Sequence, residues 1–136
     1  MISDIMDKNA IKQYLLDSEF SEVEEIEYSG EALVLRAFYD FDEDEIKAAK
    51  AYSSDESDYE AESKEWFDEF FLPYLSDIAV DNVGQILEEV MENFEIQAQF
   101  VSYEIDMNNY GFNEFILAFS NNEDMDIEEV LEEIGL

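Results

Sequence analysis

The sequence predicts an α+β fold, in which two hairpins form a four-stranded antiparallel sheet packed with about four to five helices. Two pairs of segments with the composition of strands are each joined by turn-forming residues, as in hairpins. Apolar residues at helical spacing occupy the chain before and between them. Of the 136 residues, 47% are hydrophobic and 15% aromatic, which is enough for one core. We therefore expect a single acidic domain over residues 1–136.

The N-terminal third is expected to form a helix followed by the first hairpin. Apolar residues recur at helical spacing over about 4–17 and predict a helix there. Segment 22–29 has a period-two pattern, and segment 32–41 is rich in aliphatic and aromatic residues, which together predict two strands. Gly30 and Glu31 suit the tight turn between them.

The middle of the chain is expected to be mainly helical. Residues 42–52 begin with acids and carry their lysines later, which matches the helix dipole. Residues 53–60 are polar and predict a loop or a frayed junction between helices. A buried helical stripe follows within about 57–75, interrupted near Pro73. Its members are Trp66, Phe67, Phe70, Phe71 and Leu75.

Two further helices are predicted in the second half. Asp81 suits the N-cap of a helix that runs to about Asn93. A last helix is expected over about 126–134, with Gly135 as its C-terminal stop.

The second hairpin is predicted from segments 95–106 and 111–120. Asn108, Asn109 and Gly111 lie between them and can supply left-handed turn conformations. This hairpin and the helix after it form the second half of the predicted architecture.

A weak internal repeat relates the two hairpins. Ala37–Phe38 and Ala118–Phe119 each end a predicted strand, and acids follow both at matching positions. Two similar halves would pair their hairpins into one sheet, with the helices against one face.

The charge of the chain is its second major feature. There are 38 Asp and Glu against 6 Lys and Arg, with no His, for a formal net charge of −32. Every base lies at or before Lys64, so the rest of the chain is acidic without relief. A folded chain of this mass exposes about 7,300 Å², or one net charge per roughly 230 Å². That is within about twofold of the density on duplex DNA.

The acids gather in three clusters that are candidates for partner contact. Each cluster alone is typical of a solvated surface, but solubility asks for a net charge of only about 2–8. On a helix, acids three or four apart place their Cβ atoms ~5–6 Å apart, close to the spacing of successive phosphates. The candidates are Asp55, Glu56, Asp58, Glu88, Glu89, Glu92, Glu95, Asp124, Asp126, Glu128, Glu129, Glu132 and Glu133.

Several function classes are disfavoured by composition. The chain has no Cys or His and no glycine-rich phosphate loop, so we expect no enzyme, no cofactor and no dedicated metal site. Segments 40–51 and 124–135 start with EF-hand-like acid spacing. Both lack the glycine at position 6 and the bidentate carboxylate at position 12.

Location and contact chemistry follow from the same composition. The N-terminus does not resemble a secretory signal, and no segment reaches the ~18 apolar residues of a membrane span, so we expect a cytoplasmic protein. The aromatic cluster around Trp66 is expected in the core. Tyr52 and Tyr59 lie among acids and are expected to be exposed contact residues.

The small size, extreme acidity, lack of cysteine and aromatic core together resemble the DNA-mimic inhibitors of phages and mobile elements, of anti-CRISPR or anti-restriction type. No motif defines that class, so no residue roles are carried over. The resemblance implies a cytoplasmic protein of a host bacterial cell, monomeric or homodimeric, that binds a basic nucleic-acid-binding protein. A Cas effector or a restriction enzyme is the expected partner, with direct nucleic-acid or membrane binding disfavoured.

Three alternatives remain open at this point. An immunity protein or antitoxin would neutralise a single basic nuclease or toxin with the same kind of surface. A salt-adapted ordinary domain would also be acidic, although such proteins tend to reduce the large apolar residues that are plentiful here. A chaperone for basic proteins usually carries a disordered acidic tail, which this composition does not suggest.

Overall fold

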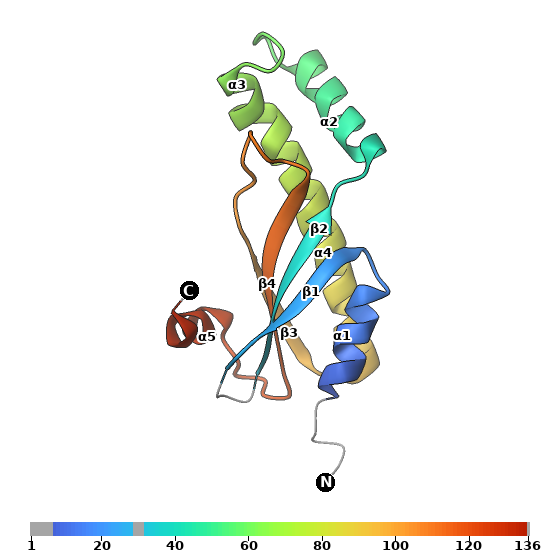
Figure 1. Cartoon of the computed structure of the whole chain (residues 1–136), viewed down its shortest axis with the longest axis vertical. Coiled ribbons are helices and arrows are strands. Elements are labelled where there is room, and N and C mark those ends of the chain that lie inside the picture. Colours follow the sequence, from blue (N-terminus) through green and yellow to red (C-terminus); the bar gives the residue numbers. More distant parts are fainter. Residues whose placement is uncertain (1–6, 29–31, 136) are drawn as a thin grey trace.

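A computed structural model of the chain describes residues 7–28 and 32–135. It has the α+β architecture predicted from the sequence, elongated along α4 (Figure 1). In chain order the elements are α1 (Lys8–Leu16), β1 (Phe20–Ile26), β2 (Leu33–Asp40), α2 (Glu43–Glu56), α3 (Lys64–Trp66), the π-helix η2 (Phe67–Phe71), α4 (Leu72–Phe94), β3 (Gln97–Ser102), β4 (Phe112–Ser120) and α5 (Ile127–Ile134).

The strands form one four-stranded sheet in the order β1-β2-β4-β3, and every neighbouring pair is antiparallel. The two hairpins meet through β2 and β4, whose register runs from Leu33 opposite Phe119 to Asp40 opposite Phe112. The predicted sheet of two paired hairpins is therefore confirmed. The predicted turn at Gly30 and Glu31 lies outside the described residues.

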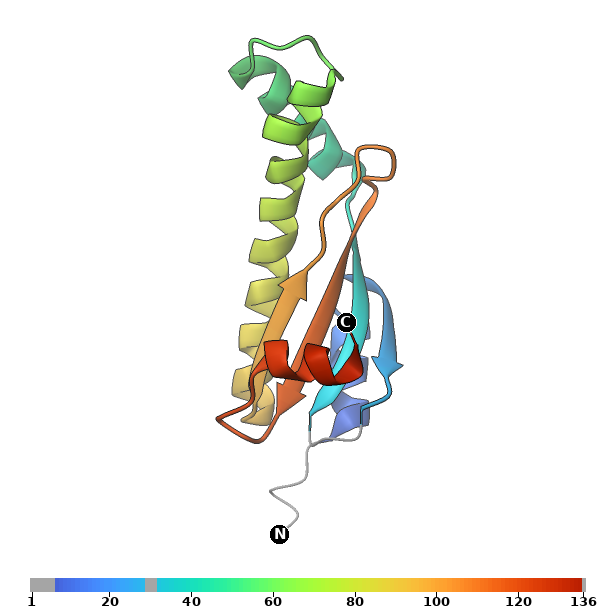
Figure 2. The same ribbon diagram turned by 90° about the vertical axis from the view of Figure 1, so that its left-hand side faces the viewer.

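Helices cover both faces of this sheet. α1 and α4 pack on one face, where Leu35 and Phe115 belong to the main core. α5 lies across the other face (Figure 2), where Val130 packs with Val34 and Ile116 in a smaller cluster. The expectation that all helices pack against one face is wrong, because β2 and β4 are apolar on both sides and need a second cover.

The two halves of the weak repeat differ in where the helix after each hairpin packs. The helix after the first hairpin, α2, contributes Ala49 to the main core. The helix after the second hairpin, α5, contributes Val130 to the smaller cluster on the opposite face. The two halves share an order of elements, but they do not share a packing arrangement.

α4 is one continuous helix where two were predicted. Asp81 is an exposed residue in its middle and not an N-cap, because the buried positions Leu75, Ala79 and Val83 continue through it at four-residue spacing. Pro73 lies in the first turn of α4, directly after η2, where it has no N–H to donate to the preceding turn. The predicted interruption nearby takes the form of the π-helix η2.

Two loop predictions are also corrected. α2 continues to Glu56, because the buried Ser53 is satisfied inside the helix by donating its hydroxyl to the Ala49 carbonyl at 2.7 Å. The β3–β4 turn uses no left-handed Asn or Gly. Instead, the Asp106 side chain accepts from the Asn108 N–H at 2.8 Å, which folds the chain locally.

The last helix matches its prediction. Asp126 caps it by accepting a hydrogen bond from the Glu128 N–H at 3.0 Å. Gly135 ends it with a φ of 93°, a conformation that glycine adopts without a steric cost.

Candidate partner-binding surface

All thirteen predicted contact acids are exposed. Asp55 and Glu56 belong to the last turn of α2 and not to a loop as expected, while Asp58 follows in the α2–α3 connection. A second group lies on the C-terminal part of α4 and its exit, namely Glu88, Glu89, Glu92 and Glu95. A third lies on α5 and the loop before it, namely Asp124, Asp126, Glu128, Glu129, Glu132 and Glu133.

The fold does not gather these three groups into one patch. The α2–α3 connection lies at one end of the long axis, whereas α5 lies in the opposite half of the molecule (Figure 1). The second and third groups are separated by the sheet, because α4 and α5 pack on its opposite faces (Figure 2). The acids therefore cover several sides of the molecule.

The solvent face of α4 is a longer acidic stripe than the sequence suggested. Between Asp77 and Asn93 its exposed residues are Asp77, Asp81, Gln85, Glu88, Glu89, Glu92 and Asn93. At 3.6 residues per turn, Asp77, Asp81, Glu88 and Glu92 fall within about 60° of one another along roughly 22 Å of helix. Asp77 and Asp81 were missed as candidates. The signal that could have identified them is the regular spacing of apolar residues along α4, which continues past both aspartates.

α5 presents an equally acidic face from a much shorter helix. Its buried residues are Ile127 and Val130, and the exposed positions between 128 and 133 are all glutamate. These glutamates form i,i+4 pairs, with Glu128 above Glu132 and Glu129 above Glu133. Such like-charge pairs oppose helix formation slightly, so their presence is not explained by stability.

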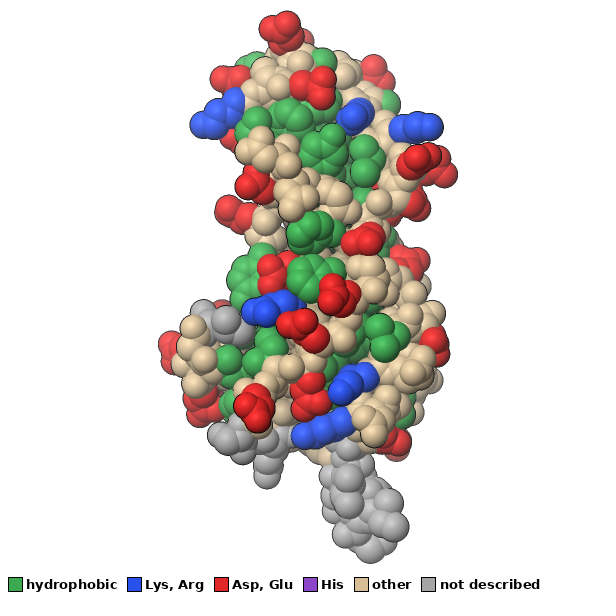
Figure 3. All heavy atoms as spheres, in the orientation of Figure 1, with side chains coloured by type: hydrophobic (Ala, Val, Ile, Leu, Met, Phe, Trp, Pro, Cys, Tyr) green, Lys and Arg blue, Asp and Glu red, His purple; other side chains and the backbone are tan. Residues whose placement is uncertain are grey.

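Few acids are neutralised within the molecule. Asp4 and Glu31 lie outside the described residues, and among the other acids only Glu24, Glu25 and Glu114 form ion pairs. Lys12 pairs with Glu25 at 3.2 Å, and Arg36 bridges Glu24 at 3.4 Å and Glu114 at 2.9 Å. Figure 3 shows a face on which basic side chains lie among the acids. The exposed faces of α4 and α5 contain no base at all.

Tyrosine hydroxyls orient some of the acids instead. Tyr14 donates to Glu89 at 3.1 Å and Tyr28 donates to Glu133 at 2.6 Å. The pKa of Tyr14 is raised by desolvation and then by Glu89, and the pKa of Tyr28 is raised mainly by its hydrogen bond to Glu133. A neutral donor fixes a carboxylate without cancelling its charge. These tyrosines were not predicted as site residues.

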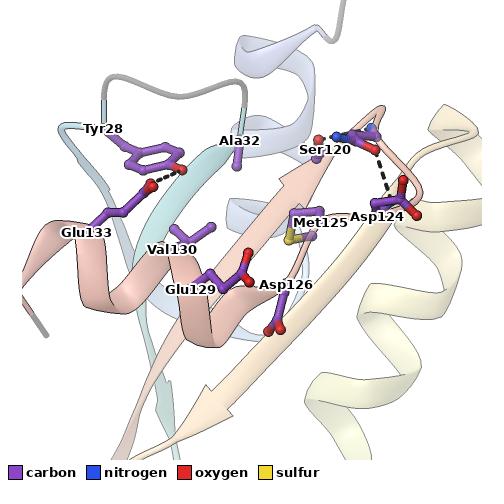
Figure 4. A pocket seen from close by; sticks show the side chains of 10 residues that line it. Tyr28, Ala32, Ser120, Asp124, Met125, Asp126, Glu129, Val130 and Glu133 are labelled. Atoms are coloured by element: carbon purple, nitrogen blue, oxygen red, sulfur yellow. Dashed lines mark hydrogen bonds between the residues drawn. The ribbon is translucent and has the colours of Figure 1, made fainter.

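An acid-lined hollow of about 220 Å³ lies beside α5. Figure 4 shows Tyr28 and Glu133, joined by their hydrogen bond, at one end and Asp124 at the other. Ala32 and Val130 supply apolar lining between them. Within residues 7–28 and 32–135, no three carboxylates are arranged to hold a metal ion. The hollow has the mixed apolar and acidic lining that suits the stem and head of a long basic side chain.

The aromatic residues divide between core and surface as expected, with one exception. Trp66, Phe67 and Phe71 are buried, and Trp66 stacks on Phe71 with ring centroids 5.1 Å apart, which confirms these members of the predicted core cluster. Phe70 was also expected in the core, but it is only half-buried, because its ring lies on the side of the helix that faces the exposed tyrosines. Tyr52 and Tyr59 are 41% and 45% exposed, and each ring lies against Phe70. They form an exposed aromatic patch beside the first acid group.

Comparison with known proteins identified no relative. No family model matches the chain, and neither a curated protein nor a solved structure is significantly similar to it. In the part of the chain that the structure describes, no helix combines the length and apolar character needed to cross a bilayer.

Proposed function

We propose that this protein is a stoichiometric inhibitor that mimics the negative charge of a nucleic acid. Its target is a basic nucleic-acid-binding protein in the cytoplasm of a bacterial host, such as a Cas effector or a restriction enzyme. The inhibitor occupies the DNA- or RNA-binding groove, or the channel that reads a short DNA motif. No catalysis and no cofactor is part of this proposal.

The observation that carries the proposal is the absence of Lys and Arg from α4 and α5, which cover opposite faces of the sheet. Unpaired carboxylates cost stability through self-repulsion, and a net charge of about 2–8 would already secure solubility. A surface that holds −32 and neutralises so little of it is suited to a partner with the opposite charge. The carboxylates would attract and orient such a partner as the phosphates of its nucleic acid normally do.

The distribution of the acids supports a groove as the docking place. A groove that holds nucleic acid has basic residues on more than one wall. α4 and α5 carry base-free acidic faces on the two sides of one sheet, so the molecule can meet two walls at once. The hollow beside α5 adds a place for a single Lys or Arg.

Competition with nucleic acid tests the proposal. Purified Cas effectors and restriction enzymes are incubated with an equimolar amount of the protein, and DNA binding is measured at several salt concentrations. We expect a target to lose DNA binding, and inhibition to weaken steeply as salt rises. If no such complex loses nucleic-acid binding, the proposal fails.

A matched pair of charge reversals tests which acids matter. One variant carries Glu88→Lys, Glu89→Lys and Glu92→Lys on α4. The control carries Glu22→Lys, Glu24→Lys and Glu25→Lys on β1, with the same change in net charge. We expect the α4 variant to lose at least about tenfold more affinity, or roughly 1.4 kcal/mol. Equal losses would mean that charge acts only in bulk.

An immunity protein or antitoxin is the alternative within the same mechanism. It would neutralise one small basic nuclease or toxin instead of a multi-component defence complex. The two proposals share a charge-complementary interface, so the identity of the captured target separates them. Inhibition of an isolated nuclease, with no effect on Cas or restriction complexes, would favour the alternative.

A further inference from the structure

The two edges of the sheet differ in how they are protected. Natural proteins guard exposed strand edges with charged side chains and bulges, because unpaired backbone groups there can bind another strand. β1 has both devices, with Glu22, Glu24 and Glu25 in the strand and an irregular register between Phe20 and Glu22. β3, the other edge strand, contains no charged residue and has a regular register with β4.

The hydrogen-bond pattern of β3 identifies which backbone groups face outward. The Tyr103 N–H donates to the Glu114 carbonyl at 3.0 Å, immediately after the last register pair of β3. In an antiparallel pair the hydrogen-bonded residues alternate along the strand. Val101 is therefore bonded to β4, while the N–H and C=O groups of Phe100 and Ser102 point away from it. Among the described residues, none of the backbone hydrogen bonds formed outside the helices and strands involves the N–H of either.

A groove lies beside the chain that follows this edge strand. It lies beyond the C-terminal end of β3 and has a volume of about 490 Å³. Leu72 and Pro73 of α4, together with Ile105, give it an apolar lining, and Asp68 and Glu104 add two carboxylates. An extended segment paired with β3 would run directly into it, because Glu104 and Ile105 follow Ser102 in the chain.

We propose that the β3 edge and this groove bind an extended basic segment of a partner protein by strand addition. The proposal rests on the inhibitor function above, and it specifies how part of the target is held. The outward backbone groups at Phe100 and Ser102 supply the pairing, and the carboxylates of the groove favour Lys or Arg at alternate positions. Apolar side chains of the segment would contact the lining of the groove.

Charge selects this occupant over a second copy of the chain. Two copies joined at β3 would bring two surfaces of formal charge −32 together. These two negative surfaces repel each other, which opposes such a dimer. The same negative charge attracts a basic segment. A dimer joined at this edge is therefore an outcome that the test must be able to detect.

Amide hydrogen exchange on the free protein provides the first test. We expect the amides of Phe100 and Ser102 to exchange at least about tenfold faster than those of Val101 and Tyr103, which bond to β4. Equal protection in a monomer would mean that the edge is closed, and the proposal would fail. Protection at Phe100 and Ser102 together with a dimeric mass in sedimentation would identify a second copy as the occupant and overturn it.

Two synthetic peptides then separate pairing from charge. One is a decamer of alternating Lys and Val, and the other is the same decamer with every backbone amide N-methylated, which keeps the charge but has no N–H to donate along either edge. At physiological salt we expect the unmethylated Lys–Val peptide to bind at least about tenfold tighter. It should also slow exchange at Phe100 and Ser102. Equal affinities would show that only bulk charge is sensed and would overturn the proposal.

Matched variants on α4 locate the site. Ser76→Arg adds a bulky cation at a residue that lines the groove, whereas Gln85→Arg adds the same charge farther along the helix. We expect Ser76→Arg to weaken Lys–Val binding at least about tenfold relative to Gln85→Arg. Equal effects would refute the groove. If both variants inhibit a nuclease target as the parent does, strand addition fails while the inhibitor function stands. If the parent protein inhibits no target, the inhibitor function fails whatever the peptides do.

Discussion

The two helices with the most uniformly acidic surfaces are anchored very differently. α4 has 23 residues and buries Leu75, Ala79, Val83, Ile86, Leu87 and Val90 in the main core. α5 has 8 residues and buries Ile127 and Val130, of which Val130 belongs to the small cluster on the opposite face. Similar acidic surfaces are therefore carried by α4, which is anchored along its length, and by α5, which is anchored by few buried residues.

This difference has a physical meaning for binding. A charge that is already fixed in place costs little conformational entropy when a partner binds. The stripe on α4 is of this kind, because its helix is anchored along its length. α5 depends on a few specific contacts, among them the side chain of Gln99, which donates to the Met125 carbonyl at 2.7 Å and accepts from the Ile127 N–H at 3.0 Å.

The largest expected effect is loss of the core beneath α4. Leu75→Ala removes a fully buried side chain and should lower the free energy of unfolding by about 2–5 kcal/mol. Val130→Ala beneath α5 should cost only about 1–2 kcal/mol, because less apolar surface is lost. Urea unfolding monitored by circular dichroism measures both. Equal losses of unfolding free energy would show that α4 and α5 are equally anchored.

A smaller effect should separate the opening of α5 from that of α4. Gln99→Ala leaves two backbone groups at the start of α5 without their partner, which should cost about 1–3 kcal/mol locally. Hydrogen exchange should accelerate in α5 and remain unchanged in α4. Gln97→Ala is the matched control, since Gln97 is in the same strand on the same face and makes no such bond. The idea is wrong if α5 exchange stays at the parent rate.

Alkaline pH should distinguish two tyrosines that bond to glutamates. Burial and then Glu45 raise the pKa of Tyr39, which donates to Glu45 at 2.8 Å and accepts from Asn82 at 2.7 Å. Because its pKa is higher in the folded state, Tyr39 contributes stability that is fully present below about pH 10 and is lost as pH rises further. Tyr39→Phe should remove a decline of about 1 kcal/mol per pH unit above pH 10.

The matched control for this pH effect is Tyr28→Phe. The pKa of Tyr28 is raised in the same direction, but its environment is more open to solvent, so we expect little change in the alkaline decline. Thermal melts between pH 7 and pH 11 provide the comparison. Identical pH profiles for the two variants would contradict the assigned role of Tyr39.

The smallest expected effect is a gain in stability on removing the stripe of α4. Neutralising Asp77, Asp81, Glu88 and Glu92 as Asn or Gln removes two like-charge i,i+4 pairs, worth together about 0.4–1 kcal/mol. The gain should appear in melts at low salt and disappear near 1 M salt. Neutralising Glu24 and Glu25 should instead reduce stability slightly, because both form ion pairs. A loss of stability in the stripe variant would indicate a structural role for these acids.

The fold was largely predictable because local patterns specify most of its elements. The strand-forming residues of the four segments and the glycine at 135 led to the observed sheet and last helix. The face chosen by α5 was not predicted, because apolar residues at Val34 and Ile116 signal a second buried face only once β2 and β4 are known to pair. Asp81 misled because aspartate suits both a helix N-cap and an exposed helix position.

The candidate surface was predicted in composition more than in arrangement. All thirteen acids are exposed, yet their separation onto different sides depends on how helices pack on the sheet. The partners of Glu89 and Glu133 are tyrosines 75 and 105 residues away, and no local pattern pairs them. The open edge of β3 likewise depends on the order of strands in the sheet.

The π-helix η2 increases the acidic surface that this part of the chain exposes. Its wide turn lets Leu72 donate to the carbonyl of Phe67, five residues back, and so accommodates one residue more than an α-helical turn. Trp66 still stacks on Phe71, while Asp68 and Glu69 are exposed on the outer side. The wide turn therefore acts as a one-residue insertion that extends the surface without disturbing the aromatic stack. Deleting Asp68 should restore an α-helical turn and withdraw one carboxylate from the groove beside β3.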